Sequence, residues 1–316
     1  MAAIKLGIVM DPIESINPEK DSSLAMLLAA QARGWELNYL EPGDLYYLEG
    51  TVYLDATELK VADSQSDWFQ LGKRTQKKAA DFDIILMRKD PPFDMEFVYC
   101  TYMLEQLERD GVLVVNRPAS LRDVNEKYAT TWFPQCAPAS MVSANPLKFR
   151  EFLEKHEDII VKPLDGMGGA SIFRIKAGDT NTGVILETLL NFGKTTAMAQ
   201  VFLPDYVKGD KRILLIDGEP VDYALARIPS AGEGRANLAA GGKGVGQPLT
   251  ERDRWICAEL KDEIKARGLY FVGIDVIGDY LTEVNVTSPT CIRELDKQFD
   301  LDIGGDLMDC LAAKLG

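Results

Sequence analysis

Oxygen-bearing side chains between residues 271 and 287 could together bind a hard metal ion. Two apolar runs flank the dipeptide Gly278-Asp279 there, and this pattern predicts a β-hairpin. Glu283 and Asn285 are two residues apart, so a strand places both side chains on one face. Carboxylate and amide oxygens are the ligands that magnesium prefers, with phosphate oxygens completing the shell. The stretch therefore predicts a magnesium site beside a phosphate group.

Asp275 joins this site only in one register of the hairpin. A two-residue loop at 278–279 places Asp275 and Glu283 on opposite faces, whereas a three-residue loop at 278–280 makes them neighbours. The alternative interpretation is an antiparallel hairpin with a polar outer face and no metal. Asn and Glu have low strand propensity, and this favours the metal site.

A second group of residues could bind phosphate. The segment 165–171 follows an apolar strand directly, and its glycines let backbone amides approach phosphate oxygens closely. Lys162 lies at the end of that strand, because Pro163 follows it, and Lys127 is a second candidate cation. A simple glycine-rich turn between strands is the alternative interpretation. The prediction of a phosphate site therefore depends on the two lysines.

Composition excludes several other kinds of chemistry. His156 is the only histidine in 316 residues, so sites that need two or three imidazoles cannot form. The five cysteines are dispersed without a Cys-x-x-Cys pair, which is typical of a reduced, cytoplasmic protein. Lys plus Arg number 35 against 49 Asp plus Glu, and the net charge of −14 disfavours nucleic-acid and anionic-membrane partners. The chemistry must therefore rest on carboxylates, lysines, arginines and backbone amides.

Apolar periodicity indicates the elements that would position these residues. In the N-terminal third of the chain, strands alternate with helices, which predicts an α/β layered domain with a parallel sheet. The expected elements are strands at 4–10, 82–87 and 111–115 and helices at 24–33, 93–109 and 120–133.

Farther along the chain, the pattern changes to short strands at 159–162, 172–175 and 198–202. Asp217-Gly218 between apolar runs predicts a hairpin. Residues 228–246 contain six glycines without helical or strand periodicity, and so long a loop is typical of a lid over a ligand. A disordered surface insert is the alternative interpretation of this loop.

These features in combination resemble the ATP-grasp ligases, and three runs narrow the resemblance to the bacterial-type glutathione synthetases. The runs are 87–94, 162–169 and 285–290. The resemblance covers nearly the whole chain and implies an α/β (α+β) protein with the ATP-grasp fold and an N-terminal Rossmann-like (pre-ATP-grasp) α/β domain. The expected domains are an N-terminal α/β domain at 1–124, a central lid domain at 125–204 and a C-terminal domain at 205–316.

The resemblance also implies a reaction. ATP phosphorylates the C-terminal carboxylate of γ-glutamylcysteine, and the amine of glycine attacks the acyl phosphate to give glutathione, ADP and phosphate. Phosphoryl transfer is mainly positioning and charge neutralisation, so no nucleophilic side chain is needed. The resemblance implies two Mg²⁺ ions, with Mn²⁺ as a substitute, ATP as co-substrate and a homotetramer of this chain.

By resemblance, each group of residues has an expected role. Arg212 and Arg235 would act in catalysis, and the metal ligands would be Asp275, Glu283 and Asn285. The residues expected to bind ATP are Lys127, Lys162, Gly166, Gly168, Gly169, Gln200, Val201, Phe202, Leu203 and Asp210. The residues expected to bind the peptide substrate are Arg88, Asn237, Ser288, Pro289 and Thr290.

One segment departs from the family pattern. The family usually reads Glu-Thr-Arg-Gly-Asn where this chain has Glu-Gly-Arg-Ala-Asn at 233–237. Because Arg235 and Asn237 are kept, anion capture by the loop is still expected. The alternatives are a D-alanine or glutamate ligase of the same fold and an ATP-binding regulatory protein without turnover. The runs 87–94 and 285–290 favour the glutathione synthetases over the other ligases.

Overall fold

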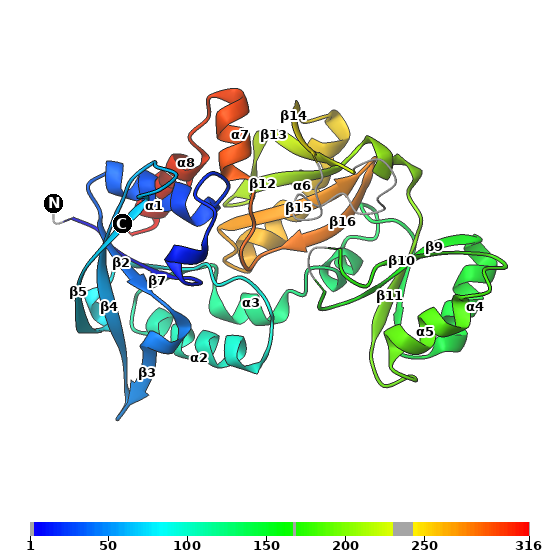
Figure 1. Cartoon of the computed structure of the whole chain (residues 1–316), viewed down its shortest axis with the longest axis horizontal. Helices are drawn as coiled ribbons and strands as arrows, with labels where there is room; N and C mark the ends of the chain where they lie inside the picture. The colour runs from blue at the N-terminus through cyan, green and yellow to red at the C-terminus, as the bar shows by residue number, and fades with distance from the viewer. Residues whose placement is uncertain (1–2, 167–168, 230–242, 316) are drawn as a thin grey trace.

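The computed structural model describes residues 3–166, 169–229 and 243–315, and it contains three β-sheets in chain order (Figure 1). The first sheet has the order β3-β4-β2-β1-β6-β7, with β5 paired to β4. Its strands are β1 Lys5–Val9, β2 Glu36–Leu40, β3 Leu45–Leu48, β4 Thr51–Val61, β5 Phe69–Lys78, β6 Ile84–Met87 and β7 Leu113–Val115. The helices of this region are α1 Ser22–Ala32, α2 Met95–Arg109 and α3 Pro118–Asp123.

Half of this sheet is parallel, as the sequence predicts. Strands β2, β1, β6 and β7 run parallel, but β4 pairs antiparallel with β2, β3 and β5. The expectation of a purely parallel sheet is therefore wrong for residues 45–78. Strand β4 alternates buried and partly exposed side chains over much of its length, and β5 is largely exposed, as an antiparallel extension at a sheet edge would be.

Local capping explains where α1 begins and ends. The Asp21 side chain accepts a hydrogen bond from the backbone N–H of Leu24, and Gly34 follows the helix with φ of +75°. The expected helix at 120–133 is broken instead. Helix α3 ends at Asp123, and a short 3-10 helix, η4 Tyr128–Trp132, follows.

The break between α3 and η4 follows from the hydrogen bonds of Asn125. Its side-chain oxygen accepts from the N–H groups of Lys127 and Tyr128, at 3.1 and 2.9 Å. Its amide nitrogen donates to the carbonyl of Leu164, 2.9 Å away on the central part of the chain. An Asn side chain that caps new N–H groups competes with helix continuation.

The central sheet is antiparallel and has the order β10-β9-β11-β8. Its strands are β8 Ser140–Ser143, β9 Asp158–Pro163, β10 Phe173–Lys176 and β11 Ala197–Val201. Helices α4 Pro146–His156 and α5 Thr182–Leu190 supply apolar residues to its core, which includes Phe149, Val161 and Leu186. No other part of the described chain contributes to this core cluster.

The third sheet is also antiparallel and has the order β14-β13-β12-β15-β16. Its strands are β12 Asp210–Ile216, β13 Glu219–Ile228, β14 Lys243–Pro248, β15 Phe271–Ile277 and β16 Tyr280–Asn285, and its helices are α6 Glu251–Ala266, α7 Ile292–Phe299 and α8 Ile303–Lys314. The predicted hairpin at 217–218 is confirmed, and both turn residues have positive φ, of 47° and 79°.

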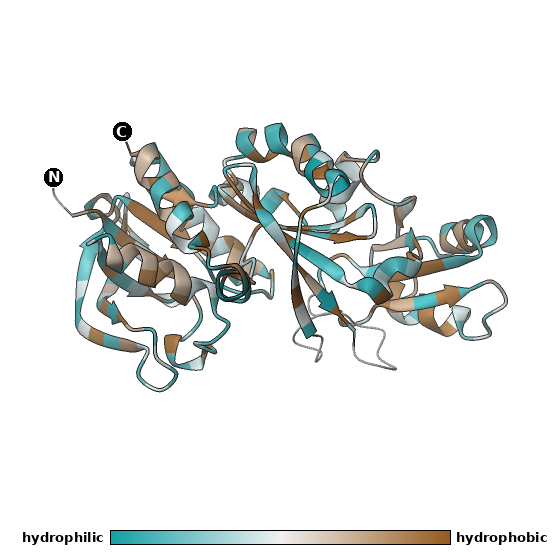
Figure 2. Ribbon diagram, turned by 90° about the horizontal axis from the view of Figure 1, so that it is seen from above, coloured by the Kyte–Doolittle hydropathy of each residue, from teal (hydrophilic) through white to brown (hydrophobic). Residues whose placement is uncertain are grey.

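The last helix returns to the start of the chain. Helix α8 packs against α1, and Figure 1 shows the two side by side. The helices around the sheets carry both hydrophobic and hydrophilic turns, as Figure 2 shows. Each sheet lies within one of the three expected domain segments, while the domain boundaries themselves stay a prediction. Within the described residues, no helix is long and apolar enough to cross a membrane.

Candidate active site

The predicted hairpin at 271–287 exists, and its register brings Asp275 opposite Glu283. The turn is the two-residue loop at 278–279, because Ile277 pairs with Tyr280. A bulge then makes Thr282 an extra residue, so the pairing that a three-residue loop was expected to produce arises with a two-residue loop. The prediction that a two-residue loop places these carboxylates on opposite faces is therefore wrong, because a bulge restores their pairing.

Asp275 is held by two arginines from neighbouring strands. Arg212 on β12 donates Nε and Nη2 to the two carboxylate oxygens, at 2.5 and 3.0 Å. Arg227 at the end of β13 lies 2.8 Å from the same carboxylate and also donates to Asp210, at 2.6 Å. Three of the five strands of this sheet, β12, β13 and β15, therefore contribute to one buried charge cluster.

Burial and charge act in opposite directions on the two carboxylates. Burial alone would raise the pKa of Asp275, but Arg212 and Arg227 outweigh it and hold the pKa below its ordinary value. For Asp210, burial dominates and raises the pKa to about 7, although Arg227 lowers it. Asp275 is thus kept ionised, whereas Asp210 titrates near neutral pH.

Lys127 lies fully buried between acidic groups and a backbone carbonyl. Its ammonium group donates to the Glu126 carboxylate and to the carbonyl of Gly166, and it lies 3.7 Å from Glu283. Burial opposes its charge, but Glu283 and Glu126 raise its pKa above the ordinary value. For Glu126, burial raises the pKa to about 7, and the nearby charge of Glu283 adds to the effect. Lys127 therefore stays charged beside the hairpin.

Lys162 reaches the hairpin from the central sheet. It is 4% exposed on β9, and its ammonium group donates to the carbonyl of Thr282, the bulge residue, at 3.3 Å. Burial lowers its pKa, and Glu283 opposes that change. Lys127 and Lys162 thus bring two positive charges close to Glu283.

The other residues expected at ATP lie along the end of β11 and the turn after β9. The buried side-chain amide nitrogen of Gln200 has no hydrogen-bond partner in the described residues. Val201 ends β11, and Phe202 stacks its ring under the Arg174 guanidinium, 3.4 Å from its centroid. Leu203 precedes a 3-10 helix that leads to Asp210. Gly166 and Gly169 border residues 167–168, and Gly169 has φ of +77°.

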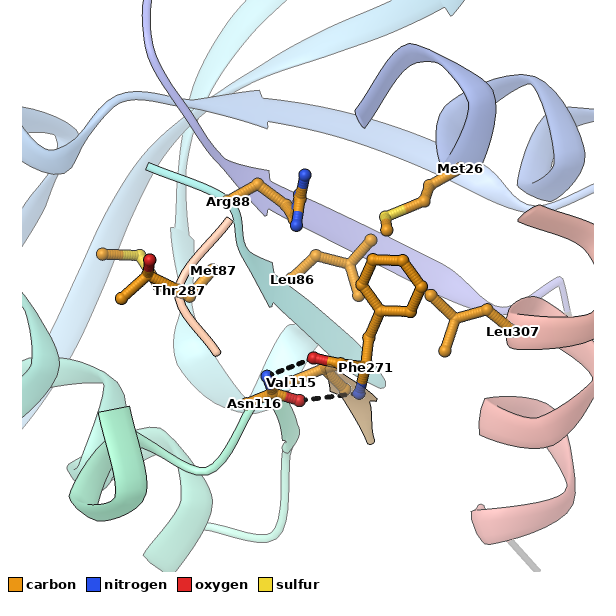
Figure 3. A pocket seen from close by; sticks show the side chains of 9 residues that line it. All are labelled: Met26, Leu86, Met87, Arg88, Val115, Asn116, Phe271, Thr287 and Leu307. Atoms are coloured by element: carbon orange, nitrogen blue, oxygen red, sulfur yellow. Dashed lines mark hydrogen bonds between the residues drawn. The ribbon is translucent and has the colours of Figure 1, made fainter. Parts of the chain in front are cut away.

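Arg88 holds the expected substrate residues from the N-terminal sheet. Its guanidinium donates to the Ser23 hydroxyl at 3.0 Å and to the carbonyl of Pro289 at 2.9 Å, and the Ser288 hydroxyl donates to the Arg88 carbonyl at 3.2 Å. Among the described residues, no carboxylate forms a salt bridge with Arg88. Burial lowers the pKa of Arg88, although Asp21 and Asp90 oppose this. A cavity beside it is lined by Arg88, Thr287, Phe271 and residues of β6, β7, α1 and α8 (Figure 3).

Thr290 and Gly273 lie next to residues 288–289. The Thr290 hydroxyl lies 3.7 Å from the Cys291 sulfur. Gly273 on β15 lies beneath Arg212 and Pro289, where a Cβ atom would come within 2.9 Å of a carbon of each side chain. Only glycine permits this close approach of Arg212 and Pro289.

Three predicted site residues lie outside the described residues. They are Gly168, Arg235 and Asn237. The expected loop at 228–246 is wrong for residues 243–246, which belong to β14 Lys243–Pro248 and pair with β13. Strand β13 ends at Ile228. These strands pair with each other next to Arg227.

Three residues of the site were not predicted from the sequence. Arg227 is the penultimate residue of β13, Glu126 precedes Lys127, and Asn116 follows β7. The sequence offered no local signal for Arg227, because its partner Asp210 is set by strand register. The others acquire partners only through tertiary register.

The oxygen donors fit magnesium only together with phosphate. Among the described residues, no group of three or more His, Cys, Asp and Glu side chains can hold a metal ion by itself. Asp275, Glu283 and Asn285 nevertheless come from one hairpin, and the buried amide nitrogen of Asn285 has no partner. Magnesium typically uses one or two protein carboxylates and takes its remaining ligands from phosphate and water, so this donor set suits a metal–nucleotide complex.

Comparison with solved structures first defines the class. An ATP-grasp ligase from Chryseobacterium gregarium aligns with TM-score 0.67 at 17% identity, over 99% of this chain and 97% of that chain. A D-cycloserine synthetase aligns with TM-score 0.69 at 14% identity, over 99% of this chain and 100% of that chain. The expected ATP-grasp fold is therefore confirmed.

Sequence comparison defines the family. Residues 4–122 match the N-terminal domain of the prokaryotic glutathione synthetase family, and residues 126–300 match its ATP-grasp domain. The glutathione synthetases of Pseudomonas putida and Escherichia coli K12 are 63% and 56% identical, each over 99% of this chain and of the relative. The chain belongs to the prokaryotic glutathione synthetase family. It is an ATP-dependent ligase that forms a peptide bond, as the sequence predicts.

Proposed function

We propose that the site around Asp275 performs the ligation that makes glutathione from γ-glutamylcysteine and glycine. The observation that carries this proposal is the convergence of Lys127, Lys162 and Arg212 on one hairpin of carboxylate and amide ligands. Such a site suits phosphoryl transfer, because buried cations can neutralise the charge that moves from ATP to the acceptor. The chain's family membership supports the same substrates.

Lys127 and Lys162 are proposed to bind the phosphates of ATP. Both ammonium groups are buried and fixed by carbonyl oxygens, so they are oriented before the nucleotide arrives. The backbone amides of 166–169 would close over the triphosphate, as the sequence resemblance implies. The segment from Gln200 to Leu203 would bind adenine, for which the unpartnered amide of Gln200 offers a free hydrogen-bond donor. Asp210 would support this region through Arg227, its hydrogen-bond partner.

Two Mg²⁺ ions, or Mn²⁺ in their place, are proposed to bind at Asp275, Glu283 and Asn285 together with phosphate oxygens. When bound, they would supply positive charge beside the triphosphate. The protein's own contribution is to fix these side chains. Arg212 and Arg227 orient Asp275, and the bulge at Thr282 aligns Glu283 with it.

The carboxylate of γ-glutamylcysteine is proposed to approach Arg212 from the side of the N-terminal sheet, where Arg88 lies. A carboxylate oxygen of γ-glutamylcysteine attacks the γ-phosphorus, and the bond to ADP breaks. The amine of glycine then attacks the acyl carbon, loses a proton and expels phosphate. Arg212 would stabilise the charge that develops in both steps. Arg88 and residues 288–290 would bind the peptide, and Arg235 and Asn237 would close over it to exclude water from the acyl phosphate.

The assembly and location of the chain are parts of the same proposal. The homotetramer rests on the resemblance to the family. The cytoplasmic location rests on the five free cysteines, which are typical of a reducing compartment. Both concern the whole enzyme and do not affect the site chemistry described above.

A coupled assay of ADP release tests the function. We expect release with γ-glutamylcysteine plus glycine and not with D-alanine or glutamate in their place. Glu283→Gln, the control variant, should retain its fold by circular dichroism and lose at least about a hundredfold in kcat. Release with D-alanine alone would overturn the substrates, and tight ATP binding without turnover would favour a regulatory protein. Near wild-type turnover in Glu283→Gln would overturn the metal assignment.

A further inference from the structure

We propose that Asn116 is a positioning residue that sets the substrate loop, defined here as residues 286–290. This inference rests on the proposed function, because it concerns the loop that would bind γ-glutamylcysteine. Asn116 follows β7 of the N-terminal sheet and is 4% exposed. It lines the cavity beside Arg88 and Thr287 (Figure 3). Among the described residues, its side chain forms hydrogen bonds with Phe271 and Val286 and none with Lys127, Lys162 or Arg212.

Asn116 uses its whole side-chain amide across the boundary between two sheets. Its nitrogen donates to the carbonyl of Phe271 at 2.8 Å and to the carbonyl of Val286 at 2.7 Å. Its oxygen accepts from the N–H of Phe271 at 2.9 Å. The amide therefore pairs with Phe271 as a residue of a neighbouring strand would, with one bond donated and one accepted.

This pairing explains why the hairpin ends where the substrate loop begins. Strand β16 ends at Asn285, so it does not pair with Phe271 of β15. Asn116 takes that edge of β15 instead, and its second N–H holds the carbonyl of Val286. The chain after Asn285 is thereby turned away from β15 toward Arg88.

The far end of the substrate loop is held by the same N-terminal sheet. Arg88 binds the Pro289 carbonyl, and the Ser288 hydroxyl binds the Arg88 carbonyl. Just after the loop, the N–H of Ile292 donates to Ser22 at 3.2 Å. The loop thus belongs to the C-terminal part of the chain by sequence, but its path is set by hydrogen bonds from the N-terminal part. Of these contacts, the one from Asn116 to Val286 lies nearest in sequence to the proposed metal ligand Asn285.

A positioning role predicts a selective kinetic defect. In Asn116→Ala, the loop loses its anchor at Val286, while the lysines that would bind ATP keep their partners. We expect kcat/KM for γ-glutamylcysteine to fall by about 10- to 100-fold, because small displacements of binding groups have effects of that size. The KM for ATP should stay within about twofold of wild type, because a substitution away from a binding site usually changes free energies only slightly.

Two further variants make the test decisive. Asn116→Asp keeps nearly the same volume and the oxygen that accepts from the N–H of Phe271. Its second oxygen replaces the N–H group and lies against the carbonyls of Phe271 and Val286, which it cannot bind. The same selective defect is therefore expected, and this variant serves if Asn116→Ala does not fold. Ser120→Ala is the matched control: its hydroxyl bonds the carbonyl of Arg267 at 2.6 Å, which ties the same two parts of the chain without touching the loop.

The outcomes separate this inference from the proposed function. Wild-type turnover with γ-glutamylcysteine and glycine, measured first, tests the function alone. The inference is supported if both Asn116 variants lower kcat/KM for γ-glutamylcysteine, with the KM for ATP near wild type, and Ser120→Ala leaves both values unchanged. It is overturned if the KM values for ATP and γ-glutamylcysteine rise together, or if the Asn116 variants lose thermal stability while both KM values stay at wild type. An equal defect in Ser120→Ala would also overturn it.

Discussion

At the scale of single residues, the site is governed by how buried charges are shared. Asp275 accepts hydrogen bonds from two arginines, and Arg227 divides its charge between Asp275 and Asp210. A metal ion at Asp275 would therefore bind a carboxylate whose charge is already partly neutralised. This favours weak protein ligation that becomes firm when ATP phosphates add their own charge.

Arg227 is expected to be essential for both stability and turnover. Arg227→Met leaves two buried carboxylates with less positive charge, so the free energy of unfolding should fall by about 3–5 kcal/mol. Adding Asp210→Asn should recover part of that loss, because it removes one unpaired negative charge. Urea unfolding of the two single variants and the double variant measures this coupling. Additive effects in the double variant would contradict a shared charge cluster.

The side chains that carry this site were predicted from the sequence better than their partners were. Lys127, Lys162 and Glu283 stand out by residue type and spacing, and Arg212 by the resemblance to the family. Arg227 was missed because its role depends on strand register: on β13 it lies opposite Asp210 of β12, and no local pattern reveals that. The sequence shows which residues are charged, but only the tertiary structure shows which charged residues become partners.

At the scale of elements, two irregularities position the site. The bulge at Thr282 aligns Asp275 with Glu283, and the break at Asn125 replaces a continuous helix. Neither was predicted, because the turn residues at 278–279 and the helical composition of 120–133 are compatible with regular elements. Tertiary hydrogen bonds decide both cases: Lys162 donates to the bulge carbonyl, and Asn125 donates to Leu164.

Asn125 should control both the break and the position of Lys127. Asn125→Ala removes the cap of η4 and the bond to Leu164, so we expect a loss of about 1–2 kcal/mol in the free energy of unfolding and a raised KM for ATP. Asn125→Asp keeps the capping oxygen and loses only the donor to Leu164. It should therefore lose less stability than the alanine variant. Chemical denaturation and initial-rate kinetics at varied ATP measure the two effects, and identical losses in both variants would show that the cap contributes nothing.

At the scale of the whole molecule, the first and last parts of the chain share their apolar cores. One core cluster combines Val9 and Leu104 with Ile213 and Ile274, and another combines Leu6 and Met26 with Leu225 and Leu307. A third cluster contains only central residues, such as Phe149 and Leu186. The alternating pattern of the sequence indicates the sheets but not which sheets share a core, since that depends on α8 returning to α1.

This arrangement predicts two unfolding units rather than three. The N-terminal and C-terminal sheets should unfold together because they share cores, and the central sheet should unfold separately because its core is its own. Leu186→Ala and Leu307→Ala make the same substitution at side chains that are 2% and 0% exposed, one in each unit. Each should destabilise its own unit by about 2–5 kcal/mol.

Differential scanning calorimetry should resolve two transitions in the wild-type chain, and each variant should lower the midpoint of one transition only. Hydrogen exchange measured by mass spectrometry assigns them: Leu186→Ala should speed exchange in β9 and β11, and Leu307→Ala in both β1 and β15, although these strands are far apart in the sequence. Exchange that accelerates in β1 without β15 would mean that the terminal parts unfold independently. A single transition shifted equally by both variants would mean that the central sheet is not a separate unit. The predicted result would make the hairpin and the substrate loop parts of one rigid unit, with the central sheet and Lys162 free to open as ATP enters.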